Sequence, residues 1–120
     1  MNIKDFEKRA MEQDKRNIFK KCNDNLSTMP EPIQKFFEEA NPTDVEVSMD
    51  GNAIKFYPCE ELGDLQKDYE LEEHGYVFAT CNSDPIFINS GKIYTCCHGS
   101  PNPKSELMAD SFEEFLALID

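Results

Sequence analysis

The last third of the chain constrains the fold most, because it alternates short apolar runs with turn residues and closes on a helix signal. Residues 76–80, 85–88 and 92–96 are rich in β-branched and aromatic side chains, and a turn signal at 89–91 separates the last two runs. This pattern predicts three strands, two of them in a hairpin. Ser111 and Glu114 form a capping box. The helix predicted over 112–119 aligns its apolar residues on one face: Phe112, Phe115, Leu116 and Ile119.

The middle of the chain carries the same mixture of elements. A helix is predicted over 30–40, with prolines in its first turn, where no backbone N–H is needed. Strands are predicted over 45–49 and 53–57 around a turn at Asp50-Gly51, and a further helix over 60–71. With 120 residues the chain has the length of one domain. We therefore expect a single α+β domain built on a mostly antiparallel sheet of about five strands with flanking helices.

The N-terminal segment gives a weaker pattern. Residues 3–23 have apolar stripes at both ends, but the residues between them, 12–17, are all polar. A helix there is either largely solvated or interrupted. The polar stretch 23–28 has the composition of a linker. The expected organisation is an N-terminal helical extension over 1–28, followed by the α+β domain over 29–120.

Charge limits the classes of partner. The chain holds 24 acidic and 12 basic side chains, a net charge of −12, and residues 1–21 are basic while the remainder is strongly acidic. Such a field repels nucleic acid and anionic membrane surfaces and attracts cationic partners. No stretch approaches the length of a membrane span. We expect neither nucleic-acid nor membrane binding, with two interpretations of the acidity left open: partner attraction and simple solubility.

The cysteines are five in number, an odd count, with no Cys-x-x-Cys spacing. This arrangement does not resemble a disulfide framework, so all five are predicted to be free thiols. The N-terminus has no apolar run after its charged residues, which argues against a signal peptide. Both observations predict a cytoplasmic location.

Reactive residues are sparse. Cys96, Cys97 and His98 are adjacent, but a thiolate nucleophile needs an electropositive setting, and the field here is negative. Together with His74, the cysteines match no zinc-ligand spacing. Paired carboxylates are abundant, as they are by chance in a chain this acidic. We predict no catalytic residue, no metal site and no cofactor, and a small enzyme using Cys96 or Cys97 with His98 remains the third hypothesis.

The segment 60–73 is the predicted binding site. Leu62, Leu65 and Tyr69 are spaced to face inward, which leaves the acidic side chains to the solvent or to a basic partner. The predicted contact residues are the acids of this segment: Glu60, Glu61, Asp64, Asp68, Glu70, Glu72 and Glu73.

Four segments of the C-terminal half suggest a family. They are Gly75-Tyr-Val-Phe-Ala, Asp84-Pro-Ile-Phe-Ile, Gly91-Lys-Ile-Tyr and Ala109-Asp-Ser-Phe-Glu-Glu-Phe-Leu. In this order, after the helix, hairpin and helix upstream, they resemble the SUKH superfamily over about residues 29–119. That superfamily includes the fungal Smi/Knr cell-wall regulators and many bacterial immunity proteins. The resemblance implies a non-enzymatic α+β domain that binds a protein, in bacteria often a nuclease toxin.

Charge and resemblance point to the same class of function. Nuclease toxins are commonly basic because they bind phosphates, and an acidic inhibitor associates with them rapidly. The leading hypothesis is a cytoplasmic immunity protein that neutralises a basic toxin. The alternative is an intracellular regulatory scaffold that binds a cellular protein without any toxin.

Overall fold

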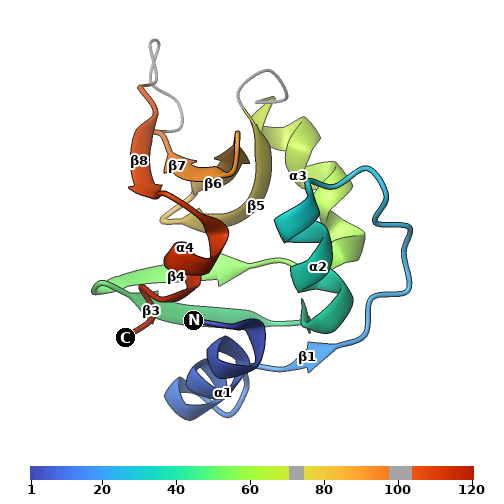
Figure 1. Cartoon of the computed structure of the whole chain (residues 1–120), viewed down its shortest axis with the longest axis vertical. Helices are drawn as coiled ribbons and strands as arrows, with labels where there is room; N and C mark the ends of the chain where they lie inside the picture. The colour runs from blue at the N-terminus through green and yellow to red at the C-terminus, as the bar shows by residue number, and fades with distance from the viewer. Residues whose placement is uncertain (71–74, 98–103) are drawn as a thin grey trace.

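A six-stranded antiparallel sheet forms the centre of the molecule, with its strands adjacent in chain order (Figure 1). The computed structural model describes residues 1–70, 75–97 and 104–120. The six strands are β3 (Val45–Met49), β4 (Asn52–Phe56), β5 (Tyr76–Cys81), β6 (Asp84–Asn89), β7 (Lys92–Thr95) and β8 (Glu106–Ala109). A separate two-stranded sheet pairs β1 (Phe19–Lys20) with β2 (Asn41–Pro42). The predicted α+β class and the antiparallel sheet are confirmed.

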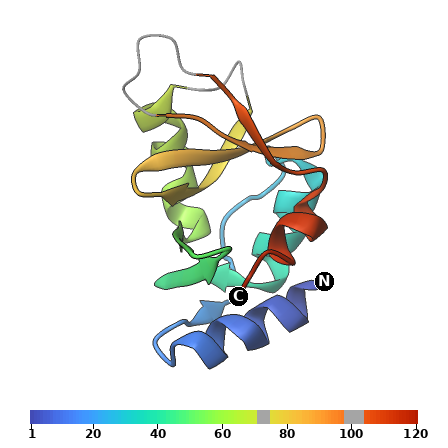
Figure 2. The same ribbon diagram turned by 90° about the vertical axis from the view of Figure 1, so that its left-hand side faces the viewer.

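Helices cover both faces of the sheet. They are α1 (Ile3–Gln13), α2 (Glu31–Glu39), the 3-10 turn η1 (Cys59–Glu61), α3 (Leu62–Tyr69) and α4 (Phe112–Leu116). Helices α2 and α4 lie on one side of the central strands and α3 on the other (Figure 2). Helix α1 packs along β3, at the edge of the sheet.

Three tight hairpins set the register of the sheet. Each has a two-residue turn, at Asp50-Gly51, Asn82-Ser83 and Ser90-Gly91, and all six turn residues have positive φ. Positive φ at both central positions defines the type I′ turn, whose twist matches that of paired strands. The turn signals at residues 50–52 and 89–91 therefore predict both hairpins correctly.

The core is a cluster of phenylalanine rings, which supply the large side chains in a chain without tryptophan. Phe56 and Phe78 project from the sheet, Phe36 from α2 and Phe115 from α4, and all are at most 1% exposed. The rings of Phe78 and Phe115 lie 5.5 Å apart edge to face, an arrangement that aromatic pairs favour. Phe6 of α1 is fully buried in the same cluster, 5.4 Å from Phe56. Helix α1 is thus part of the common core.

Several elements differ from prediction, including the short strands β1 and β2, which no local pattern indicates, and α3, which is shorter than the helix expected over 60–71. Of the two alternatives expected for residues 3–23, the structure has the interrupted helix: α1 ends at Gln13, because Asp14 accepts hydrogen bonds from the backbone and guanidinium of Arg16 and turns the chain. Helix α4 ends at Leu116 and not at Ile119, which instead forms a bridge with Met49. Strand β8 was not predicted, because residues 104–109 lack alternation and follow a stretch rich in Gly, Ser and Pro.

The outer edge of β3 is covered by side-chain amides. The Gln13 amide accepts from the Ser48 N–H at 2.8 Å and donates to the Ser48 carbonyl at 3.1 Å. The Asn17 amide does the same for Glu46, at 3.0 and 3.1 Å. Each amide thus replaces one residue of a neighbouring strand, and the N–H of Asp120 adds a further bond to the Ser48 carbonyl at 2.9 Å. Within β3, the outward backbone groups of Glu46 and Ser48 therefore all have partners, which makes them unavailable to other chains.

Candidate functional site

Helix α3 packs against β5 and is hydrogen-bonded to it, which places the acidic segment on a defined part of the surface. Leu62 and Leu65 are buried beneath the helix. The Gln66 amide donates to the Val77 carbonyl at 2.6 Å and accepts from the Val77 N–H at 2.8 Å. Strand β4 pairs with β5 only as far as Phe56 and Ala79, so Gln66 supplies the pairing that β4 no longer offers. The residues predicted to face inward therefore do so, with Tyr69 half-buried.

The predicted acidic residues of the described segment lie on the outer side of this helix. Glu61, Asp64, Asp68 and Glu70 are all exposed. Among the described residues, no ion pair involves any of them. We call these four residues the α3 acidic surface. Glu72 and Glu73, which were also predicted to bind, lie outside the described residues.

Glu60 occupies a different environment from the other acids. Its carboxylate Oε1 lies 3.4 Å from the Asn41 amide nitrogen and 3.2 Å from the Cys59 sulfur. The side chain therefore turns toward β2 and η1 and lies at the margin of the α3 acidic surface. Glu60 is itself exposed, like the other predicted acids of the described segment.

The C-terminal end of α3 is joined to the β5–β6 turn. The Tyr69 hydroxyl donates to the Ser83 carbonyl at 2.6 Å. Burial raises the pKa of the Tyr69 hydroxyl, and the nearby Tyr57, Asp84 and Asp68 raise it further. Asp84 thus adds a carboxylate beside the α3 acidic surface, one that no periodicity argument on the helix indicates.

The prediction that all five cysteines are free thiols is wrong, because Cys22 and Cys59 form a disulfide. An odd count and the absence of Cys-x-x-Cys exclude only close pairs, whereas these partners are 37 residues apart in sequence. They meet because β1 pairs with β2 and the Asn41 side chain in β2 accepts the Cys59 N–H at 2.8 Å. Disulfides are typical of oxidising compartments, so the thiol argument for a cytoplasmic location no longer holds.

Two other groups of potentially reactive residues include members in the described part of the chain. Cys22, Cys59 and Glu60 bring potential metal ligands within 4.8 Å of one another, and in the disulfide-bonded form seen here neither cysteine has a thiolate to offer a metal. Burial, together with Asp84 and Cys97, raises the pKa of the Cys96 thiol and disfavours a nucleophilic thiolate. His98 lies outside the described residues.

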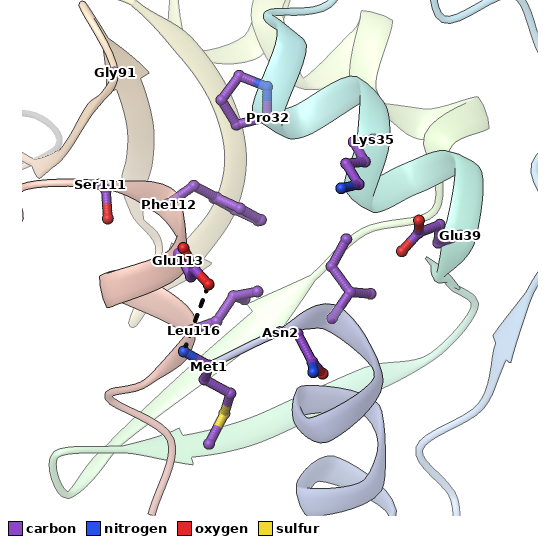
Figure 3. Close-up of a pocket in the computed structure, with 11 residues that line it drawn as sticks. Met1, Asn2, Pro32, Lys35, Glu39, Gly91, Ser111, Phe112, Glu113 and Leu116 are labelled. Carbon is purple, nitrogen blue, oxygen red and sulfur yellow. Dashed lines mark ion pairs between the residues drawn. The ribbon is translucent and has the colours of Figure 1, made fainter.

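A groove of about 400 Å³ lies between the start of α1, α2 and α4 (Figure 3). Phe112 and Leu116 form part of its apolar floor, with Lys35, Glu39 and Glu113 at its rim. The Met1 amine is 3.9 Å from the Glu113 carboxylate. The residues that line the groove come from segments far apart in sequence, so no sequence motif could have indicated the groove. Its charges are mixed, which favours no cationic or anionic ligand.

Comparison with known proteins identifies no relative. No protein-family model matches the chain, and neither the curated proteins nor the solved structures include a significant match. Within the described residues, no helix combines the length and the apolar character needed to cross a membrane.

Proposed function

We propose that this chain is a non-enzymatic protein-binding domain that neutralises a basic, nuclease-type toxin. The observation that carries the proposal is the α3 acidic surface: four exposed carboxylates on a helix fixed by buried leucines and by the Gln66–Val77 hydrogen bonds. Because no described ion pair neutralises these carboxylates, they are available to a cationic partner. The resemblance of residues 29–119 to the SUKH superfamily supports a binding role of this kind.

The electrostatics support fast association more than high affinity. An exposed charge pair contributes only about 0–1 kcal/mol. Charges of one sign gathered on one surface instead raise the encounter rate, and salt screens that effect. The whole chain adds a net charge of −12 to the local field. A basic nuclease domain presents the complementary field on the surface that binds phosphates.

The first experiment is capture of the partner. The tagged chain is used as bait in an extract of the native cell, and the bound proteins are identified by mass spectrometry. A basic toxin domain supports the proposal. A cellular regulator without toxin activity supports the alternative, a regulatory scaffold. Capture of only acidic or neutral proteins contradicts a basic toxin as the partner, and the absence of any specifically bound protein contradicts both proposals.

The second experiment measures the association rate of the captured partner. The triple variant Glu61→Lys, Asp64→Lys, Asp68→Lys should slow association clearly, and raising the salt concentration should slow association of the parent protein. The matched control reverses Glu12, Asp24 and Asp44, which are also exposed but lie elsewhere. Equal rates for the triple variant and its control would show that the α3 acidic surface is not the contact.

The compartment is tested separately. We propose a cytoplasmic encounter, where an incoming nuclease acts on nucleic acid. In that compartment the Cys22–Cys59 pair is expected to be reduced. Alkylation of thiols at the moment of lysis, followed by mass spectrometry, distinguishes the two states. Recovery of the Cys22–Cys59 disulfide from cells would place the protein in an oxidising compartment and contradict this part of the proposal.

A further inference from the structure

The outer side of β8 is the second edge of the sheet, and it differs from the β3 edge. Leu107 in the middle of β8 is 53% exposed, although it is a large apolar residue. Glu106 before it and Asp110 after the strand are exposed acids. Among the described residues, none pairs with β8 from the side opposite β7.

The register of the sheet shows which backbone groups point outward from β8. Residues beside a two-residue turn exchange both hydrogen bonds, and successive pairs then alternate. In the β6–β7 hairpin, Asn89 and Lys92 are that first pair, so Tyr94 directs its N–H and C=O toward β6. Tyr94 therefore does not bond to its other neighbour, Leu107. Counted from the Tyr94–Leu107 and Thr95–Glu106 pairs, the N–H and C=O of Leu107 point away from the sheet, and the β7–β8 register shifts at the next step, between Ile93 and Tyr94.

The β3 edge follows the same alternation of inward-facing and outward-facing residues. There Met49 and Asn52 are the pair beside the turn, so Ser48 and Glu46 should direct their backbone groups outward. The amides of Gln13 and Asn17 bond to these groups. The sheet thus satisfies its outward backbone groups at β3 with side chains, whereas Leu107 has no corresponding amide among the described residues.

We propose that the edge of β8 binds an extended, cationic segment of the protein partner, which adds to the sheet as a seventh strand. One residue of that segment would exchange both backbone hydrogen bonds with Leu107, as strand addition requires. An apolar side chain would cover the exposed Leu107, and Lys or Arg residues would face Glu106 and Asp110. The cationic character of the segment rests on the proposed function, which assigns a basic partner.

A second copy of this chain is the competing occupant. Pairing β8 with itself would bring together two bodies that each carry a net charge of −12. The resulting repulsion opposes self-association at low ionic strength. A cationic segment is attracted by the same field, and the charge of the molecule thus favours it.

Hydrogen exchange measured by NMR on the full chain tests the open edge first. The amide of Leu107 should exchange much faster than those of Ser48 and Glu46, which bond to Gln13 and Asn17. A Leu107 amide as protected as Ser48 in the dilute monomer would mean that the edge is already covered, which overturns the proposal.

A synthetic peptide in which Lys and Val alternate then serves as the probe. At saturation it should slow exchange of the Leu107 amide by about tenfold, whereas a peptide of alternating Glu and Val should not. No slowing by the Lys peptide, or equal slowing by both peptides, would overturn the proposal. A dimer seen by sedimentation that protects Leu107 without any peptide would identify a second copy as the occupant and overturn it as well.

Variants at β8 provide the second readout. Leu107→Pro removes the outward N–H and leaves the β7 ladder intact, as proline on a sheet edge allows. It should weaken binding of the Lys peptide about tenfold in fluorescence anisotropy, while Leu107→Ala, which keeps the N–H, should weaken it less. Unchanged peptide affinity in Leu107→Pro would contradict strand addition.

The α3 triple variant separates this inference from the proposed function. Helix α3 packs against β5, so reversal of its charges should preserve the Leu107 protection produced by the peptide. If the peptide binds but no basic partner is captured, the proposed function fails and strand addition stands. If a basic partner is captured and Leu107→Pro does not weaken its binding, the proposed function stands and strand addition fails.

Discussion

The two edges of the central sheet are treated differently by this protein. At β3, amide side chains from the N-terminal segment bond to every outward-facing backbone group of Ser48 and Glu46. At β8, the outward groups belong to Leu107, an exposed apolar residue between two exposed acids. A covered edge adds stability and prevents unwanted pairing, whereas an open edge remains available to another chain. The β3 edge thus contributes to stability, and the β8 edge is the one that we propose for recognition.

The largest loss of stability is expected from a substitution in the aromatic core of the molecule. Phe115 is fully buried and contacts the rings of Phe56, Phe78 and Phe112. Phe115→Ala should lower the free energy of unfolding by about 3–5 kcal/mol. Chemical denaturation of the variant and the parent measures this difference in the free energy of unfolding. A loss below about 1 kcal/mol would mean that α4 does not pack on the sheet as described.

Removal of the disulfide should cause the second-largest loss of stability. Cys22 lies shortly after Asn17, and its bond to Cys59 holds this segment near the body of the molecule. Cys22→Ser should lower the free energy of unfolding by about 2–4 kcal/mol, because the unfolded chain gains freedom. Cys97→Ser, at an exposed free thiol, is the matched control and should have little effect. Equal stability of the two variants under oxidising conditions would contradict a disulfide contribution.

The edge comparison itself is tested by replacing Asn17, which is 4% exposed. Asn17→Leu keeps a similar volume but leaves the N–H and C=O of Glu46 without their partners. We expect a loss of about 1–3 kcal/mol, and a smaller loss for Gln13→Ala, because Gln13 is exposed and water can replace its amide. If Leu107→Pro at β8 destabilises the fold as much as Asn17→Leu does, the two edges are not different.

The smallest effect should be a pH dependence at the β3–β4 turn. The Asp120 carboxylate accepts from the Ser48 hydroxyl and from the N–H groups of Gly51 and Asp50, and these bonds lower its pKa from the ordinary 3.8. A lowered folded pKa stabilises the fold above the ordinary value, and that stabilisation is lost as the pH falls through the folded value. Asp120→Asn should therefore be less stable than the parent at neutral pH. The difference should narrow below about pH 4.

Local patterns determine much of this fold before any tertiary contact is considered. The capping box at Ser111 and Glu114 places the start of α4 correctly, with the Ser111 hydroxyl accepting from the Glu114 N–H at 3.0 Å. Alternation and turn residues place β3, β4, β6 and β7 within a residue or two. These signals are readable because each depends on residues a few positions apart. The exposure of Glu61, Asp64 and Asp68 follows from the same helical periodicity.

Contacts between distant segments are decided only by the tertiary structure. The disulfide joins residues 37 positions apart, and the Asn17–Glu46 and Gln13–Ser48 pairs span 29 and 35 positions. A polar residue such as Asn17 has the same local signature whether it is solvated or buried against a strand edge. Strand β8 likewise exists because β7 offers it a partner and not because of its own composition. Sequence periodicity thus determined which elements form, while packing decided which edge of the sheet is closed and which is open.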